Sequence, residues 1–189
     1  ESLLAHFADP SLAAVAPRVR ALRGGAHATW IEQYEATNSS LDMGVLGGLV
    51  RPQTELGWVP AATLIARVDA LRDSFNGSQV FDESMRSGED VNFVWKLIDA
   101  GWRVRYDPDV SVRHEHRQTM RGWLARKAVY GSSAGPLAQM HPDALAPAVF
   151  TPWSAIFVTG LLIQRRWSLG LALGALGWAW TSLVRRMIG

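Results

Sequence analysis

Residues 81–108 read FDESMRSGEDVNFVWKLIDAGWRVRYDP, and this stretch decides the fold class. Four apolar residues in it follow the i, i+3, i+4, i+7 spacing of one helix face: Val91, Val94, Trp95 and Ile98. Gly101 then supplies a natural left-handed cap to end that helix. Segments 102–106 and 109–112 alternate like strands on either side of Pro108. The stretch therefore predicts a helix pressed on a sheet, which is an α/β arrangement.

The segments on either side extend this pattern. We expect a helix over residues 2–8 that begins upstream of Glu1, and a buried strand over residues 13–19 that ends near Pro17. The remaining expected elements are, in chain order, a mostly loop-like stretch at 26–57, a strand at 59–65, a short helix at 68–72 and a helix at 119–130 with Met120, Trp123, Leu124 and Ala128 on its packed side.

Composition excludes several classes of protein. Hydrophobic residues make up 48% of the 189 residues, which is too apolar for a disordered chain. The formal net charge of +2 gives no nucleic-acid signature, so no nucleic-acid partner is expected. The absence of cysteine excludes disulfides, thiolate zinc sites, iron–sulfur clusters and cysteine nucleophiles, and it suits a reducing compartment.

Two long uncharged runs dominate the end of the chain. Residues 144–164 carry no charge, and residues 167–184 form a second such run between two arginine pairs. Each approaches the roughly 20 apolar residues that a membrane-spanning helix needs. Interfacial tryptophans and small residues support the same interpretation, namely Trp167, Trp178, Trp180, Gly170, Gly174 and Gly177.

We therefore expect two regions, a soluble α/β part at 1–143 and a hydrophobic membrane-associated helical region at 144–189. Pro147 and Pro152 interrupt the first run, which favours a segment that lies in the interface or re-enters. The arginine pairs at both ends of the second run leave its topology open. The alternative is a helical hairpin buried in a soluble core. No basic N-terminal signal peptide is visible.

The first candidate site is acidic. Glu89 and Asp90 follow Ser87 and Gly88, where a flexible turn opens a helix. Free backbone N–H groups and the positive end of the helix dipole favour carboxylates at such a position. One interpretation is that both residues cap the helix. The other is that one of the two carboxylates projects into a cleft as a general base. Spacing alone does not choose between these two roles.

The second candidate site is basic. His114 and His116 lie at i, i+2 near a strand end, so they point the same way and could grip a metal or a phosphate. Positive charge continues along the following helix at Arg117, Arg121, Arg126 and Lys127. Such cations suit a pyrophosphate or anionic lipid headgroups. The alternative is a solvated polar loop.

The order and spacing of these residues resemble those of a known protein family. The pattern FDExxxxGEDVxxxxxLxxAGWRVxYxP at 81–108 resembles the inverting family 2 glycosyltransferases, which are nucleotide-diphospho-sugar transferases of the GT-A, Rossmann-like fold. Residues 34–44 (YEATNSSLDMG) and 6–20 (HFADPSLAAVAPRVR) make the chain most similar to the mycofactocin-system glycosyltransferases. The resemblance covers nearly the whole chain.

The resemblance implies roles for the acidic site. The second acid of the ED pair is the catalytic base in such transferases, and it corresponds to Asp90. Glu89 would orient the acceptor or support Asp90. A divalent cation, Mg²⁺ or Mn²⁺, would offset charge on the departing diphosphate, because hard ions prefer oxygen ligands. His114 is the candidate contact to that metal or diphosphate.

The resemblance also implies substrate or diphosphate binding by Arg117, Arg121 and Trp123. The family's QxxRW element corresponds to Arg121 and Trp123, except that Gly122 stands between them here. The family's metal-binding DxD motif is expected upstream of Glu1. The chain is thus expected to be the acceptor-side, C-terminal part of a GT-A domain with a membrane tail, and to be inactive alone.

The expected activity is inverting transfer of a hexose, glucose from UDP-glucose, to a hydroxyl of the mycofactocin peptide-derived redox cofactor. Its partners would be the nucleotide sugar, this acceptor and membrane lipid, at the cell membrane with the catalytic domain on the cytoplasmic side. A second candidate is a membrane-associated family 2 transferase that acts on a lipid or cell-wall glycan. A third, of another class, is a catalytically silent membrane-anchored binding module.

Overall fold

The computed structural model describes residues 2–22, 28–115, 119–145 and 151–188. The chain divides into two compact units, Glu1–Leu145 and Ala146–Gly189. Ala144 and Leu145 pack against the core of the first unit. Each unit is described by itself below.

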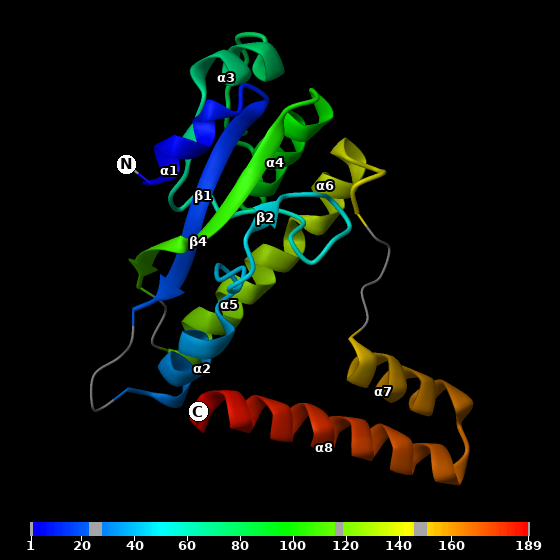
Figure 1. The fold of residues 1–189 in the computed structure, drawn as a ribbon. Coiled ribbons are helices and arrows are strands. Elements are labelled where there is room, and N and C mark those ends of the chain that lie inside the picture. The colour runs from blue at the N-terminus through cyan, green and yellow to red at the C-terminus, as the bar shows by residue number, and fades with distance from the viewer. Residues whose placement is uncertain (1, 23–27, 116–118, 146–150, 189) are drawn as a thin grey trace. The chain divides into compact units, whose positions relative to one another are not determined.

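The first unit alternates helices and strands, which confirms the predicted mixture of α and β structure (Figure 1). Its elements are α1 (Ser2–Ala5), η1 (His6–Ala8), β1 (Leu12–Ala21), α2 (Trp30–Asn38), β2 (Gly48–Leu49), β3 (Ile65–Ala66), α3 (Val68–Phe75), α4 (Glu89–Asp99), β4 (Arg103–His114), α5 (Met120–Ser132) and α6 (Ala134–Met140).

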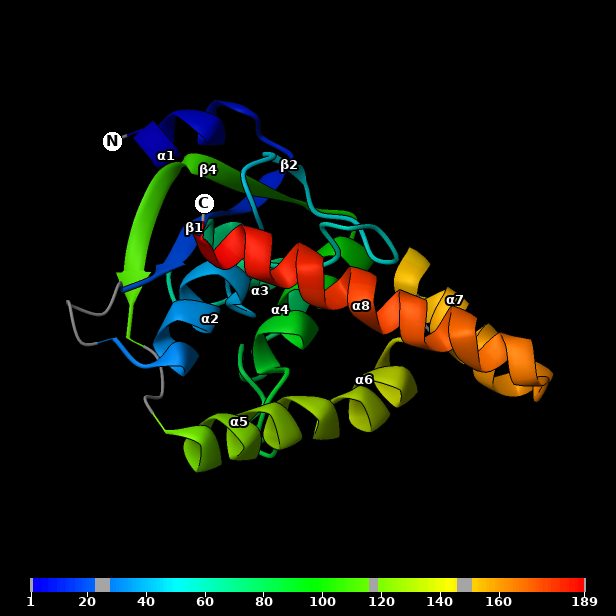
Figure 2. The same cartoon turned by 90° about the horizontal axis from the view of Figure 1, so that it is seen from below.

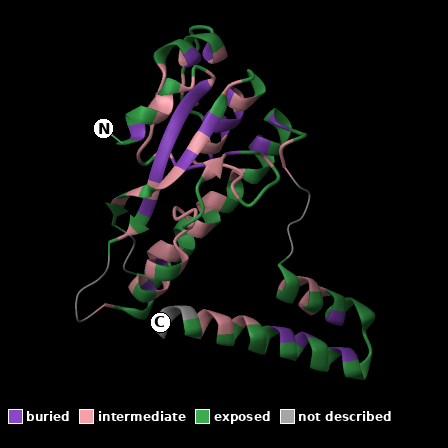
Figure 3. Ribbon diagram, viewed as in Figure 1, coloured by how far each residue is buried: buried purple, intermediate pink, exposed green. Residues whose placement is uncertain are grey.

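A four-stranded sheet in the order β2-β4-β1-β3 forms the centre of this unit. β1 and β4 pair in parallel, and the two short strands pair antiparallel to them. β1 is buried along most of its length (Figure 3). One apolar cluster joins it to α1 and η1, and a larger one joins the sheet to α3, α4 and α6. Viewed from below, the sheet, α4 and the α5–α6 pair follow one another as layers (Figure 2).

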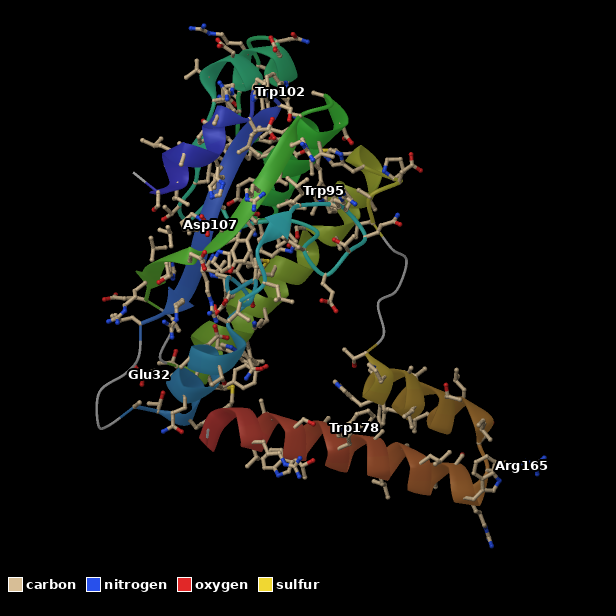
Figure 4. All side chains as sticks on the ribbon, viewed as in Figure 1. Glu32, Trp95, Trp102, Asp107, Arg165 and Trp178 are labelled. Atoms are coloured by element: carbon tan, nitrogen blue, oxygen red, sulfur yellow. The ribbon has the colours of Figure 1, made fainter. Side chains whose placement is uncertain are left out.

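The predicted helix of residues 91–98 is present as α4. Val94 and Trp95 are buried on it, and the Trp95 indole, labelled in Figure 4, donates to the carbonyl of Gly57 at 2.8 Å. Gly101 has φ +88 just after the helix, as predicted for a left-handed cap. Gly88 at the N-cap is also left-handed, with φ +83. Two glycines therefore set where α4 begins and ends.

Two predicted strand ends are wrong. β1 continues through Pro17 to Ala21, and β4 is one strand that runs through Pro108 rather than two strands around it. The register explains why, because Pro17 pairs with Asp107 while the next residue, Arg18, pairs with Ser111. This irregularity places Pro108 in an unpaired bulge, where its missing N–H breaks no ladder hydrogen bond.

Two segments before α3 also differ from expectation. The stretch predicted as loop contains α2, which begins with a complete capping box between Thr29 and Glu32. The strand predicted over residues 59–65 shrinks to β3 at Ile65–Ala66. Val59 and Pro60 are buried in the core without strand pairing, so the apolar run marks burial there rather than a strand.

The packed side of α5 is rotated from the predicted one. Met120 and Leu124 are exposed at 41% and 54%, whereas Trp123, Lys127 and Tyr130 turn inward at i, i+4 and i+7. This inward side faces a polar cavity rather than an apolar core. An apolar periodicity therefore could not identify it.

The second unit consists of α7 (Pro152–Ile163) and α8 (Arg166–Ile188), joined by a tight turn at Gln164 and Arg165. Pro152 opens α7 after the Thr151 cap. The close contact between the helices is made by Gly160, where an added Cβ would lie 2.9 Å from the carbonyl oxygen of Ser168.

Gly170, Gly174 and Gly177 make no such close contact, since a Cβ added at any of them meets nothing within 4 Å. Within the described residues, one helix, Arg166–Arg185, is long and apolar enough to cross a membrane by length and composition. α7 is apolar but shorter. Trp178, labelled in Figure 4, is half exposed on α8.

Candidate functional site

A candidate cavity of the first unit lies between the start of α4 and the inward side of α5. We call it the Asp90 cavity; its volume is about 600 Å³. Glu89 and Asp90 line one wall, Arg126, Lys127 and Tyr130 line the facing one, and segment 60–62 closes the side. The structure thus places the two predicted carboxylates opposite two cations.

Asp90 is held in a partly buried position at the first turn of α4. Its Oδ1 accepts a hydrogen bond from the Val91 N–H at 2.9 Å, which satisfies one of the free N–H groups of the first turn. Burial raises the pKa of Asp90 above its usual range, and the neighbouring charge of Glu89 raises it further, against the lowering effect of backbone N–H donors. A carboxylate with a raised pKa is a stronger proton acceptor once it is ionised.

Glu89 has a different environment. Its Oε2 is buried and accepts no hydrogen bond from any residue that the structure describes. Buried carboxylate oxygens are normally hydrogen-bonded, because an unpaired one loses its hydration without replacement. The Glu89 side chain therefore has an unused acceptor beside the Asp90 cavity.

Arg126 and Tyr130 form the facing wall together. The Arg126 guanidinium lies 5.7 Å from the centre of the Tyr130 ring, a cation–π contact. Burial raises the pKa of Tyr130, the Arg126 charge lowers it, and the charge of Asp90 raises it. Charges from both walls of the cavity therefore act on Tyr130.

A second cavity adjoins the first. This His114 cavity, of about 410 Å³, lies where β4 ends, and His114, Glu115, Glu35 and Trp123 line it. Five residues line both cavities: Ser40, Leu41, Arg126, Lys127 and Tyr130. The predicted base and the predicted diphosphate contact therefore share a wall on α5.

A buried carboxylate ties α2 to α5 in this shared wall. Glu35 on α2 is 6% exposed, and its Oε1 accepts a hydrogen bond from the Trp123 indole N–H at 2.6 Å. The same oxygen lies 3.6 Å from Lys127 Nζ. Lys127 also donates to the Ser40 hydroxyl and lies 5.5 Å above the Trp123 ring.

Sequence reasoning found part of this arrangement. Glu89 and Asp90 lie in one cavity and His114 and Trp123 in the other, whereas Arg121 is exposed and lines neither. Arg117 lies outside the described residues. The prediction missed Glu35, although the Thr-x-x-Glu capping pattern at residues 29–32 was a signal for the helix that carries it.

The described residues do not by themselves form a metal centre. Among residues 2–22, 28–115, 119–145 and 151–188, no three His, Asp or Glu side chains converge as metal ligands. Within these residues, His114 is not part of a group of three such side chains, and its role as a metal or diphosphate contact stays a prediction.

Comparison with known proteins agrees with the predicted resemblance. No protein-family model matches the chain, and no solved structure matches it. The chain is 48% identical over 151 residues, 80% of its length, to the pre-mycofactocin glycosyltransferase of Mycobacterium tuberculosis strain CDC 1551 / Oshkosh. The same identity and coverage hold for that of strain ATCC 25618 / H37Rv.

The chain spans 31% of the length of each of these curated relatives. The predicted similarity to the mycofactocin-system glycosyltransferases is thereby confirmed: over four-fifths of its length, this chain is similar in sequence to part of the pre-mycofactocin glycosyltransferases.

Proposed function

We propose that the chain is the acceptor-side part of a glycosyltransferase that acts on pre-mycofactocin. Its 48% identity to proteins of that name supports the activity and the acceptor. The observation that carries the assignment to specific residues is the Asp90 cavity, in which two carboxylates face two cations. The GT-A fold, a hexose donor such as UDP-glucose and inversion at the anomeric carbon belong to this proposal.

In the proposed reaction, Asp90 takes the proton from the acceptor hydroxyl as that oxygen attacks the anomeric carbon. The bond from the sugar to the nucleoside diphosphate breaks on the opposite face, so the configuration inverts in a single displacement. The raised pKa of Asp90 suits this role, because a stronger base accepts the proton more readily. General base catalysis of this kind contributes about 10²–10⁴-fold.

The other residues of the cavity bind and position in this proposal. The unpaired Oε2 of Glu89 offers an acceptor for a second hydroxyl of the incoming substrate. Arg126 and Lys127 supply positive charge near the leaving diphosphate. A Mg²⁺ or Mn²⁺ ion, which the family resemblance implies, needs ligands in addition to these residues. No step of the mechanism is assigned to it.

Association with the membrane is a separate part of the proposal. The length, composition and exposure of α8 support insertion of this helix. A catalytic unit on the cytoplasmic side belongs to the proposal. The same helix favours the second candidate, a transferase acting on a lipid-linked glycan, since such an acceptor resides in the bilayer. Membranes washed at high salt distinguish the modes of attachment, because salt releases electrostatically bound protein but not an inserted helix.

The central test replaces Asp90 with Asn in the full-length protein. Asp90→Asn should lower the rate of sugar transfer to pre-mycofactocin by at least about 100-fold, since the amide cannot accept the proton. Asp73→Asn is the matched control, because Asp73 is exposed on α3 and lines neither cavity. Equal activity of the two variants would remove Asp90 as the base. A wild type that binds the acceptor without turnover would instead favour a silent binding module.

A further inference from the structure

The wall that the two cavities share depends on a residue of α2 that the sequence did not single out as a site residue. Lys127 lines both cavities, and the indole of Trp123 lines the second. Both side chains extend from α5, which buries none of its residues completely. Contacts from a neighbouring element are therefore needed to hold them in one conformation.

Glu35 on α2 makes those contacts. Its Oε1 accepts from the Trp123 Nε1–H at 2.6 Å and lies 3.6 Å from Lys127 Nζ. The edge of Tyr34, the preceding residue, meets the Trp123 ring at a centroid distance of 5.7 Å. Two adjacent residues of α2 thus fix the position of a single indole.

α2 itself is well anchored. The capping box of Thr29 and Glu32 sets its start, which places Ile31 and Glu35 on one buried side of the helix. Beyond its end, Arg18 of β1 holds Asp42 through two hydrogen bonds, at 2.7 and 2.9 Å. These contacts hold the start of α2 and the segment that follows its end.

The charge of Glu35 is as important as its position. A buried carboxylate requires a compensating partner, and Lys127 provides it. The Lys127 ammonium is consequently drawn to the junction of the two cavities, where it also donates to Ser40. A neutral side chain at position 35 would leave the ammonium free to adopt other rotamers.

We propose that Glu35 is a positioning residue for sugar transfer, which acts through Lys127 and Trp123 to set the wall opposite Asp90. This inference rests on the proposed function. It predicts that loss of the Glu35 charge weakens substrate binding more than the chemical step, because Glu35 touches the binding wall and not Asp90.

The test uses Glu35→Gln in the full-length protein, with transfer measured at varied concentration of the nucleotide sugar, because Lys127 lies near the diphosphate in the proposed function. The Gln amide oxygen can still accept from the Trp123 indole, so the variant removes the charge and keeps that hydrogen bond. We expect KM to rise about tenfold with kcat within about twofold of wild type. Glu32→Gln is the matched control on the same helix; Glu32, labelled in Figure 4, lines neither cavity, and Gln retains a capping box.

A double-mutant cycle with Lys127→Met shows whether Glu35 acts through Lys127. The double variant should be no worse in KM than Lys127→Met alone, whereas a purely structural role of Glu35 would add its own loss. Additive losses, or a normal KM for Glu35→Gln, would overturn the inference. If Glu35→Gln does not fold, Glu35→Asp replaces it in the same cycle, because it keeps the charge but withdraws the carboxylate from Lys127 and Trp123 by one methylene. Absence of sugar transfer by the wild type refutes the proposed function itself.

Discussion

Gly88 offers a quantitative test of how α4 and α6 are held together beside the Asp90 cavity. Its backbone has φ +83, a conformation that residues with a side chain rarely adopt. A Cβ added there would lie 2.8 Å from Ser133 Cβ and 3.1 Å from Leu137 Cδ1. Ser133 Cβ is attached directly to the backbone, so it cannot move aside by a change of rotamer. Gly88→Ala therefore forces α6 away from α4.

The expected loss of stability has two parts. The left-handed conformation costs about 1–2 kcal/mol for a residue with a Cβ, of which about 0.4–1 kcal/mol is recovered because alanine restricts the unfolded chain. Overpacking adds about 1–3 kcal/mol. Gly88→Ala should thus lower the free energy of unfolding by about 1–5 kcal/mol in total, the sum of these terms.

Gly101→Ala separates the two parts. Gly101 follows the other end of α4 with φ +88, and a Cβ there meets nothing within 4 Å. Gly101→Ala incurs the cost of the left-handed backbone conformation without a steric overlap, so we expect the free energy of unfolding to fall by about 1 kcal/mol. Urea titration of the chain in mild detergent, followed by tryptophan fluorescence, measures both values. Equal losses for the two variants would refute the reasoning, since they would show that α6 does not pack against Gly88.

Three further predictions follow from other parts of the chain. Because burial raises the pKa of Asp90 and only its ionised form accepts a proton, kcat/KM for transfer should rise as pH increases through that raised pKa; a plateau already reached at the ordinary value of about 4 would contradict this. Tyr106→Phe removes the buried hydroxyl that donates to the Gly44 carbonyl at 2.7 Å, so the free energy of unfolding should fall by about 1–2 kcal/mol, and an unchanged urea midpoint would contradict it. Gly160→Ala should speed amide hydrogen exchange in α7 by pushing it from α8, whereas Gly174→Ala, with open space around its Cβ, should not.

The elements that the sequence predicted well are those in which local signals agree with the tertiary environment. α4 combines an apolar helix face with glycines at both ends, and the same residues form the core beneath the sheet. The family motif around Asp90 could also be recognised from the sequence, because it is a long pattern of residues in a fixed order and its recognition requires no tertiary contacts. Strand ends at Pro17 and Pro108 were not predictable, since a bulge shared by two strands, not the proline alone, decides whether a strand continues.

The candidate site was predictable on the acidic side and only in part on the basic side. Asp90 and Glu89 follow from the start of one helix, which is a local feature. The rotation of α5 and the role of Glu35 depend on α2 and α5, which are about 90 residues apart in the chain. A buried carboxylate is unfavourable until its partners arrive from elsewhere, so a short sequence window gives no sign of it.

By itself, the amino-acid sequence determined the α/β class, the position of α4, the pair of carboxylates at its start and the apolar helices at the end of the chain. The tertiary fold alone brings Asp90 into one cavity with Arg126 and Lys127, joins Trp123 to Lys127 through Glu35, and leaves Arg121 exposed outside both cavities. The physical reason is that periodicity and capping act within a few residues. Charge pairing across a cavity depends on which distant segments the packing brings together.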